Sequence, residues 1–480
     1  VVGTLQNNGS AVEVDSVTFK EGGTNFTNSL LVGTDSTGTL SSADGNTGVG
    51  TGVFAALTSA DNNVAVGCGA LNANTTGGNN VAIGKGSMLV NTVGLANVSV
   101  GDGNMGSNTE GECNTSVGQG ALNANTTGDS NVSLGRQSLK SNTTASNNTA
   151  IGTFALCANT TGATNVAVGL CALKANTTAD DNTSIGGQTL SANTTGARNT
   201  ALGQGALFTN TTASNNTALG RHALLLNTTG ASNVAVGKGS LDANTEGSCN
   251  VAVGEDSLGA NNTGVHNVAV GTIALLSNTT GGENTAVGWG SQANNTTAGS
   301  NSSFGNQTLC INTTGSQNTA IGFRAMCKNT TGNDNVALGI NALKLNTTGS
   351  TNVAAGRDAL VSNTTAGNNI GVGSYSLKST TTGSNNIGIG QGALCTNVTG
   401  IKNIAIGTEA LRYNTGSNNT AIGYVALDAN TSASSNTAVG ESSLGANTTG
   451  ASNVAVGHGA LTTNTTASNN AAVGTNALKS

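Results

Sequence analysis

The chain has 480 residues, of which 71 are Gly and none is Pro; aromatic residues make up 2%, charged residues 8%, and the formal net charge is −6. Such weak and scattered acidity provides no basic stripe for nucleic acid and no polybasic patch for anionic lipid, so neither is expected as a partner. No window approaches the roughly 20 consecutive apolar residues of a membrane-spanning helix, so no span is expected.

Residues 1–45 do not follow the pattern of the rest of the chain, and we expect a β-rich segment there that leads into the repeats. From Asn46 onward the sequence falls into rows of equal length, whose positions we number as slots one to seventeen. There are 26 row starts, ending at Asn470, and the row that begins at Asn403 is one residue short. Slot one is Asn and slot five is Gly in every row. A fixed short period is the signature of a solenoid, so residues 46–480 are predicted to form one coil per row.

The first five slots read N-[TV]-A-[VI]-G, as in the row that begins at Asn63. Because β-branched and small residues alternate, these slots predict a short strand with the two kinds of side chain on opposite faces. The Gly of slot five fits a positive φ or a close approach of two backbones. A second short strand is expected at slots eight and nine, which usually hold a small residue and then Leu. The N-T-T-G that follows is expected to close the coil as a turn.

The predicted core consists of the aliphatic residues in slots four and nine. Its representatives are Val66, Leu71, Ile83, Ile151, Leu156, Val168 and Leu173. Small residues in slots three and eight are expected on a second apolar face that packs against sister chains. Columns of identical residues are expected to stack as structural ladders: Asn63, Asn80 and Asn97 in slot one, Gly67, Gly84 and Gly101 in slot five, and Asn74, Asn125 and Asn159 in slot twelve.

Two other repeat architectures fit the rows less well. Helical repeats need apolar residues at three-to-four spacing and good helix formers, and these Gly-, Asn- and Thr-rich rows have neither. A triangular β-helix shows an aliphatic residue about every six positions, whereas here they cluster at slots two, four and nine. The prediction is an all-β fold, a parallel β-solenoid of flattened, two-sided coils. Each coil buries only a few aliphatic side chains, and their burial does not offset the entropy lost when the coil is ordered. We therefore favour a homotrimer over a self-sufficient monomeric solenoid.

Several kinds of chemistry compete with this structural interpretation. The Asn of slot twelve begins the glycosylation sequon N-x-[ST] in most rows, as at Asn74. Two interpretations are possible, hydrogen-bonded ladders alone or glycosylated sequons, and we favour ladders alone. Ice binding usually needs T-x-T, but Thr75 and Thr76 are adjacent and point apart. The GGxGxD loops of a calcium-binding roll are missing. The histidines lie rows apart, with no carboxylate cluster nearby, so no catalytic residue, metal site or cofactor is predicted: they are His222, His266 and His458.

The eight cysteines occupy variable slots and show no C-x-x-C metal spacing. Four share slot ten, which also holds Lys, Asp and Phe and is expected to face outward: Cys157, Cys310, Cys327 and Cys395. Two others, Cys113 and Cys249, lie in slot seventeen. Cys310 and Cys327 follow each other in one slot and should stack one strand spacing apart. Their parallel side-chain directions give a poor disulfide geometry, so free thiols are expected.

The rows resemble two known kinds of repeat. "NVAVG", "NTAIG" and "NIAIG", followed by a small residue and Leu, resemble the head repeats of trimeric autotransporter adhesins, which are shorter than these rows and form left-handed parallel β-rolls in trimers. The full row "NTAIGFRAMCKNTTGND" more closely resembles repeats of phage tail-fibre proteins, and residues 18–50 look like the segment that leads into such repeats. The resemblance implies a left-handed solenoid in a homotrimeric fibre.

The resemblance and the small, stackable slots lead us to expect the structural shaft of an extracellular, cell-surface or virion fibre, which spaces or supports an adhesive tip. The expected partners are further copies of the chain, in a homotrimer or filament, whereas a host-cell or surface receptor would bind parts outside this chain. The alternative is a direct binding surface, adhesive along its length or ice-binding through Asn and Thr ladders. Slots six, seven, ten, sixteen and seventeen vary freely, which favours a spacer. No enzyme activity is expected.

Overall fold

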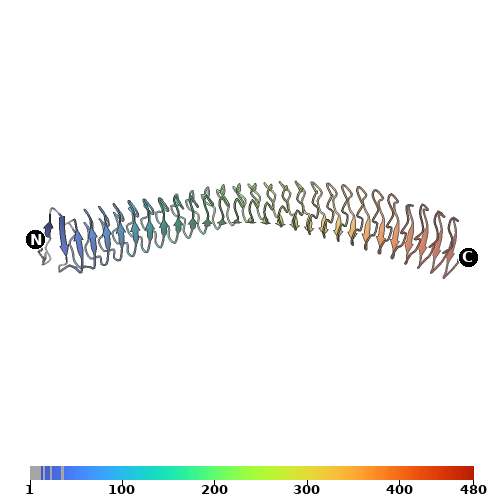
Figure 1. Ribbon diagram of the computed structural model, residues 1–480, viewed down its shortest axis with the longest axis horizontal. Helices are drawn as coiled ribbons and strands as arrows, with labels where there is room; N and C mark the ends of the chain where they lie inside the picture. The colour runs from blue at the N-terminus through green and yellow to red at the C-terminus, as the bar shows by residue number, and fades with distance from the viewer. Residues whose placement is uncertain (1–11, 15–16, 22–23, 34–36, 480) are drawn as a thin grey trace. The chain divides into compact units, whose positions relative to one another are not determined.

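The computed structural model describes residues 12–14, 17–21, 24–33 and 37–479. The chain divides into two compact units, Val1–Lys238 and Gly239–Ser480. The described residues of both units form short strands, turns and bends without a helix, and in each unit the chain winds into stacked coils (Figure 1). The prediction of an all-β parallel solenoid with one coil per row is confirmed.

In the first unit, each three-residue strand lies parallel to the strand of the next coil, which is formed by the same slots of the next row. The pairing of Thr149 with Val166, and of Ile151 with Val168, is typical. Because the register equals the sequence period, identical slots lie side by side in successive coils. The strands from Asn46 onward are β6 (Thr47–Val49), β7 (Val64–Val66), β8 (Val81–Ile83), β9 (Val98–Val100), β10 (Thr115–Val117), β11 (Val132–Leu134), β12 (Thr149–Ile151), β13 (Val166–Val168), β14 (Thr183–Ile185), β15 (Thr200–Leu202), β16 (Thr217–Leu219) and β17 (Val234–Val236).

The second unit has the same arrangement and absorbs the one short row without a slip of register. The turn from Asn414 to Gly416 is one residue shorter than in other rows, yet Ile404 in slot two still pairs with Thr420, the slot-two residue of the next row. The strands are β18 (Val251–Val253), β19 (Val268–Val270), β20 (Thr285–Val287), β21 (Ser302–Phe304), β22 (Thr319–Ile321), β23 (Val336–Leu338), β24 (Val353–Ala355), β25 (Ile370–Val372), β26 (Ile387–Ile389), β27 (Ile404–Ile406), β28 (Thr420–Ile422), β29 (Thr437–Val439), β30 (Val454–Val456) and β31 (Ala471–Val473).

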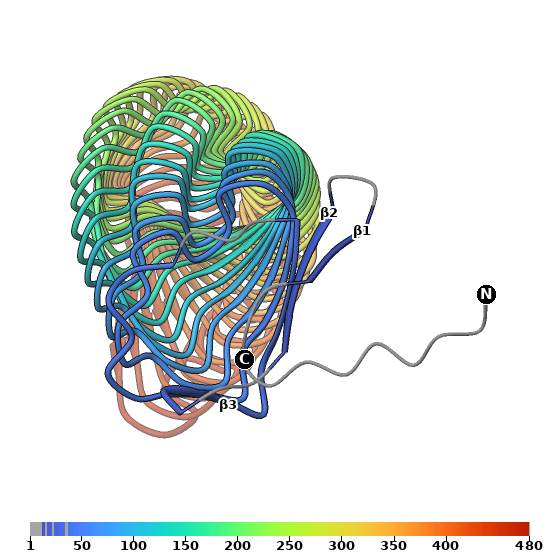
Figure 2. The same cartoon turned by 90° about the vertical axis from the view of Figure 1, so that its left-hand side faces the viewer.

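The first unit begins with antiparallel strands. β1 (Val12–Val14) pairs antiparallel with β2 (Val17–Glu21), and β2 pairs antiparallel with β4 (Leu30–Val32). Figure 2 shows β1 and β2 beside the first coils. β3 (Phe26–Thr27) pairs parallel with β5 (Ala43–Asp44). Of the β-rich segment predicted for residues 1–45, residues 1–11, 15–16, 22–23 and 34–36 lie outside the described residues.

The parallel stack starts one row before Asn46. β4 pairs parallel with β6, and Leu30 lies opposite Thr47, one full period along the chain. Ser29 takes the place of Asn in slot one of this first coil, and its Oγ accepts a hydrogen bond from the Asn46 backbone nitrogen at 2.9 Å. Because Ser stands in slot one instead of Asn, this coil does not match the repeated sequence pattern.

The strand side of each coil turns its small residue inward. Ala65 and Ala150, the middle residues of β7 and β12, are fully buried. The slot-four residues point outward, and the prediction that they belong to the core is wrong: Val66 is 36% exposed, Ile83 39% and Ile151 37%, and Val168 is half-buried.

The interior is too narrow for the larger side chain. Three coils have Gly in slot three, and in two of them an added Cβ would lie close to a Leu of slot nine, 3.2 Å from Leu377 Cγ at Gly388 and 3.4 Å from Leu360 Cγ at Gly371. A single methyl group therefore fills the space between the strand and the Leu residues of slot nine. Since successive side chains of a strand alternate, burial of slot three places slots two and four outside.

The opposite side of each coil consists of turns. The predicted core residues Leu71, Leu156 and Leu173 are fully buried there, with φ angles of 47°, 50° and 49°. The Asn74 backbone nitrogen donates to the Leu71 carbonyl at 3.3 Å within the turn, and Leu71 itself donates to the Ser87 carbonyl of the next coil at 3.1 Å. Left-handed residues bend the backbone out of the extended conformation, so the prediction of a second strand at slots eight and nine is wrong.

The Gly of slot five is required for two reasons, a positive φ and the close approach of the next coil's backbone. Gly67 has φ 129° and Gly101 φ 143°, a region that residues with a Cβ avoid. A Cβ added to Gly67 would lie 2.6 Å from the Gly84 carbonyl oxygen of the next coil, and one added to Gly84 would meet the Gly101 carbonyl oxygen. The glycine column therefore marks a place where a side chain would clash with the backbone of the next coil.

Two columns of Asn close each coil from within. Asn80 Nδ2 and Asn91 Nδ2, from slots one and twelve, both donate to the Gly94 carbonyl, at 2.9 and 3.0 Å. Asn91 Nδ2 also donates to Asn74 Oδ1 of the preceding coil at 3.0 Å, while Asn80 Oδ1 accepts from the Asn97 backbone nitrogen at 3.0 Å. The Asn residues predicted for these ladders are all fully buried: Asn63, Asn80, Asn97, Asn74, Asn125 and Asn159.

Candidate interaction surfaces

The outward residues of slots two and four form a surface that we call the strand face. In each unit it is two side chains wide and repeats at every coil, with coils about 4.8 Å apart. Its exposed apolar members include Val49, Val66, Ile83, Val117, Ile151, Ile185 and Leu202 in the first unit, and Val270, Phe304, Ile321, Leu338, Val372, Ile389, Ile406 and Ile422 in the second.

The strand face carries no charge. In none of the 26 rows is slot two or slot four occupied by Asp, Glu, Lys, Arg or His. An exposed apolar surface that excludes charge throughout is typical of a contact surface, because solvent-facing positions ordinarily tolerate charged residues. This exclusion is the signal in the sequence that could have identified slots two and four as a contact face; the aliphatic side chains alone suggested a core.

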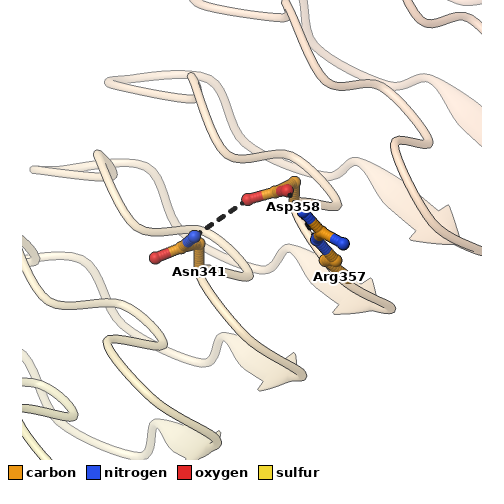
Figure 3. Close-up of polar contacts among 3 residues, drawn as sticks. All are labelled: Asn341, Arg357 and Asp358. Carbon is orange, nitrogen blue, oxygen red and sulfur yellow. Dashed lines mark hydrogen bonds and ion pairs between the residues drawn. The ribbon is translucent and has the colours of Figure 1, made fainter.

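The edge formed by slots six and seven changes its chemistry from coil to coil. Asn341 Nδ2 donates to Asp358 Oδ1 at 3.0 Å, and Arg357 Nε lies 3.4 Å from Asp358 Oδ2 (Figure 3). In other coils the same edge exposes large aromatic residues, Trp289 and Tyr424. Because its chemistry differs at each coil, this edge offers no repeated unit for a partner to recognise.

The Asn residues of the sequons lie inside the coil. Asn159 Nδ2 donates to Asn142 Oδ1 at 3.0 Å and to the Gly162 carbonyl at 2.8 Å, and the side chain is fully buried. The neighbouring Thr160 Oγ1 donates to the Thr177 carbonyl of the next coil at 3.0 Å. A glycan on this amide nitrogen would break the ladder, so in the folded coil these sequons act as ladders.

The four cysteines of slot ten are half-buried, free thiols. Cys157 lies near Lys140 and Lys174 of the neighbouring coils. Burial raises the pKa of this thiol, and the two cations partly oppose the effect. Cys395 has a raised pKa for the same reason.

Cys310 and Cys327 differ from these because they are neighbours in one slot. Both are free, as expected, and the Cys310 thiol donates a hydrogen bond to the Cys327 sulfur. This bond raises the pKa of Cys310 and lowers the pKa of Cys327 to about 6. Burial acts against the lowering, whereas Arg324, Lys344 and Lys328 add to it.

A shallow cavity of about 230 Å³ opens in the second unit, around Gly392. Slot seven carries Tyr375 and Glu409 in the two flanking coils, and Gly392 between them has no side chain, which accounts for the hollow. Arg412 Nη1 forms an ion pair with Glu409 Oε1 at 2.6 Å, and Lys378 Nζ lies 5.2 Å from the centre of the Tyr375 ring. The other lining residues are Gln391 and Cys395.

The predicted absence of a catalytic centre concerns His222, His266 and His458, which lie in different coils. Within the described part of the chain, no group of three or more His, Cys, Asp and Glu side chains is placed to hold a metal ion. The same residues include no helix that is long and apolar enough to cross a membrane.

Comparison with models of protein families finds no match to this chain, and comparison with curated proteins finds none either. Function is therefore inferred from the surfaces of the coils.

Proposed function

We propose that this chain is the structural shaft of an extracellular or virion fibre, in which copies associate side by side through the strand face. The assembly is a homotrimer or a filament of such units, and it spaces or supports an adhesive tip formed by other parts of the fibre. The chain contributes stiffness and length and performs no catalytic step. The observation that carries the proposal is a face free of charge that every coil repeats, with an apolar residue in slot four of every row.

The periodicity of the strand face favours a second copy of the chain as its partner. A partner made of the same coils presents its own apolar residues at the same spacing, so contacts can match coil for coil. A globular partner without that period can match only a few coils. Symmetric association of identical chains is also the commonest kind of oligomer.

Self-association through slots two and four replaces the arrangement predicted from the sequence, in which the small residues of slots three and eight pack against sister chains. Ala65 and Ala70, which represent these slots, are fully buried within their own coil. They are unable to contact another chain, whereas the apolar residues of the strand face are exposed or half-buried and recur in every row.

The test compares two exposed apolar positions in one coil of the second unit. Leu338, in slot four, is 39% exposed, and Ile340, in slot six, is 50% exposed. The double variant Leu338→Glu/Ile321→Glu places charges in the proposed contact on two successive coils. It should reduce the assembly to single chains in sedimentation experiments. Ile340→Glu should leave the mass of the assembly unchanged.

Circular dichroism of both variants should match that of the unmodified chain, since all three positions point away from the coil interior. An unchanged mass for the Leu338 and Ile321 variant would refute the proposed contact. Dissociation by Ile340→Glu alone would place the contact on the edge of slots six and seven.

One observation favours a second function, a local binding surface, namely the cavity around Gly392. Slot seven accepts larger residues in the same left-handed conformation, as Gln307 with φ 55° and Tyr375 with φ 62° demonstrate. Gly392→Gln should therefore fill the cavity without disturbing the coil. If the cavity binds a ligand, a panel of neutral and acidic oligosaccharides should contain one that binds the unmodified chain and loses binding to this variant.

Ice binding through the ladders is not proposed. The Asn ladders face the coil interior, and the Thr hydroxyls next to them, such as that of Thr160, donate to backbone carbonyls. Neither column presents a free, flat array of hydrogen-bonding groups to water.

A further inference from the structure

We infer that Cys310 and Cys327 form a binding site for one soft, monovalent metal ion with the chemistry of copper(I), held in a linear arrangement between the two sulfur atoms. They are the only two of the eight cysteines that occupy the same slot in consecutive rows. Thiolates are the ligands that select such ions over harder cations.

The backbone fixes the relative position of the two thiols. The Ile311 nitrogen donates to the Cys327 carbonyl at 3.0 Å, and the Leu309 nitrogen donates to the Ala325 carbonyl at 3.1 Å. These bonds on either side of Cys310 hold the two coils in register there. Both cysteines occupy slot ten, and the strand register brings identical slots of the two coils side by side, so the two side chains start from neighbouring positions on the same side of the coils.

The separation of the coils matches the length of a linear sulfur–metal–sulfur unit. Adjacent coils lie about 4.8 Å apart. A metal–thiolate bond is about 2.3 Å long for zinc, so two such bonds in line span roughly 4.6 Å. A disulfide needs the two Cβ atoms at about 3.8 Å, which parallel side chains on neighbouring coils do not provide without movement of the backbone. The pair is therefore spaced for a bridging ion rather than for a sulfur–sulfur bond.

The number of ligands limits the kind of ion. No third His, Cys, Asp or Glu side chain joins the pair within the described residues, so the tetrahedral site that zinc prefers does not form. Two-coordinate binding is characteristic of monovalent ions with a filled d shell. On binding, both thiols release their protons to solvent, and both sulfurs coordinate the ion as thiolates.

The surroundings compensate the charge of the complex. Two thiolates and one monovalent ion carry a net charge of −1, and Arg324, Lys328 and Lys344 act on this site. Arg324 is held in place by a hydrogen bond from its Nε to Gln307 Oε1 at 2.8 Å. Both thiols are half-buried and remain within reach of solvent, so an ion has access to them.

The experiment uses the full chain, reduced and without air, and silver(I) as a redox-inert probe of this chemistry. The chain is mixed with silver(I) and dialysed against an excess of a small monothiol, and its intact mass is measured under native conditions. A chelating pair should retain one silver ion per chain, and the measured mass should include the ion but no bound monothiol. The second sulfur of the pair acts at high effective concentration and therefore outcompetes the free monothiol. Cys310→Ala and Cys327→Ala should each lose that ion.

Matched variants separate a pair from a single thiol. Slot ten accepts Ala, as at Ala293, so these substitutions are compatible with the coil. Cys395→Ala removes a slot-ten thiol that has no cysteine in the same slot of either adjacent row, and it should leave the retained ion in place. Lys378→Cys, next to Cys395, should create a second pair and raise the content to two ions per chain.

Three results would overturn the inference. The first is an unmodified chain that retains no silver, and the second is retention of the ion by either of the two alanine variants. The third is a loss of two hydrogens from the mass of the unmodified chain under these reducing conditions, which would reveal a disulfide.

Discussion

Gly84 and Gly86 lie two residues apart in one coil, yet only Gly84 is required by the fold. Gly84 has φ 133°, and an added Cβ would meet the backbone of the next coil, whereas Gly86 has φ 63° and open space around it. The same slot as that of Gly86 holds Gln137 with φ 54° in another coil. The requirement for Gly therefore comes from the approach of two backbones as well as from the sign of φ.

Gly84→Ala should destabilise its coil by about 3 kcal/mol or more, because the strained φ and the displaced neighbouring coil add. Gly86→Ala should cost about 1 kcal/mol, the penalty of a left-handed Ala alone. Amide hydrogen exchange of the surrounding coils measures the difference. Equal loss of protection in the two variants would contradict the geometry.

Neighbouring residues of one strand should differ as sharply. Ala167 is fully buried, and Val168 is half-buried on the strand face. Ala167→Asp places an unpaired carboxylate in a space filled by one methyl group, at a cost of several kcal/mol, and limited proteolysis should reveal a new cut near this coil. Val168→Asp leaves its carboxylate in contact with water, so the single chain should resist cleavage there. Cleavage of Val168→Asp but not of Ala167→Asp would reverse the inside and the outside of the strand.

At the scale of the element, the backbone of each coil bends at residues with left-handed φ angles, and the types of these residues do not predict that conformation. The coil that begins at Asn131 bends at Gln137, Leu139 and Asn147, with φ 54°, 46° and 62°. Each such residue costs about 1–2 kcal/mol, which hydrogen bonds to the neighbouring coils must offset. A coil is therefore stable only within a stack, as in other repeat proteins.

The Asn ladder of slot twelve shows what one missing member does. Thr380 replaces Asn in this slot and donates its hydroxyl to the Asn397 carbonyl at 2.9 Å. The buried Asn363 Oδ1 of the preceding coil, which would accept from an Asn at 380, is left without a hydrogen bond. This interruption is a local weakness of the second unit.

Thr380→Asn should restore the ladder and stabilise this part of the second unit by about 1 kcal/mol, the usual net value of one hydrogen bond to a group that is otherwise buried unpaired. Slower hydrogen exchange in the coils around 363 and 397 would show the gain. The reverse change at an intact position, Asn159→Thr, should weaken the first unit by a similar amount. A loss of protection in Thr380→Asn would mean that the coil has adapted to Thr.

At the scale of the whole molecule, every unit is a sum of coils and contacts between neighbouring coils, and its outward chemistry differs from side to side. The strand face is apolar and free of charge, while the edge of slots six and seven carries ion pairs and polar contacts such as those of Asp358. The proposed association uses the first surface and leaves the second in water.

Association through the strand face should therefore respond weakly to salt. Raising sodium chloride from about 0.05 M to about 0.5 M screens charged contacts but not apolar ones, so sedimentation should show the same assembly at both concentrations. Sulfate at high concentration should strengthen the assembly, because it favours the burial of apolar surface. Dissociation by sodium chloride would indicate that charged edges hold the chains together.

The sequence by itself determined the period, the place of the strand, the glycine column and the Asn ladders. It could do so because a parallel solenoid converts sequence period into register, so that each repeated residue has an identical neighbour at a fixed distance. Gly67 and Asn74 could be assigned from their recurrence alone. Alternation in the strand likewise showed that Ala65 and Val66 lie on opposite faces.

Only the tertiary structure decided which of those faces is inside. That choice depends on the width of the coil, which is limited by contacts between slot three and the slot-nine Leu of the preceding row, as between Gly388 and Leu377. The left-handed φ of Leu71, which replaces the expected second strand by a turn, follows from the same packing, because a buried Leu must reach a narrow interior from a closed turn. Local residue preferences do not depend on such contacts. The sequence pattern alone therefore placed the outward face of the strand in the core.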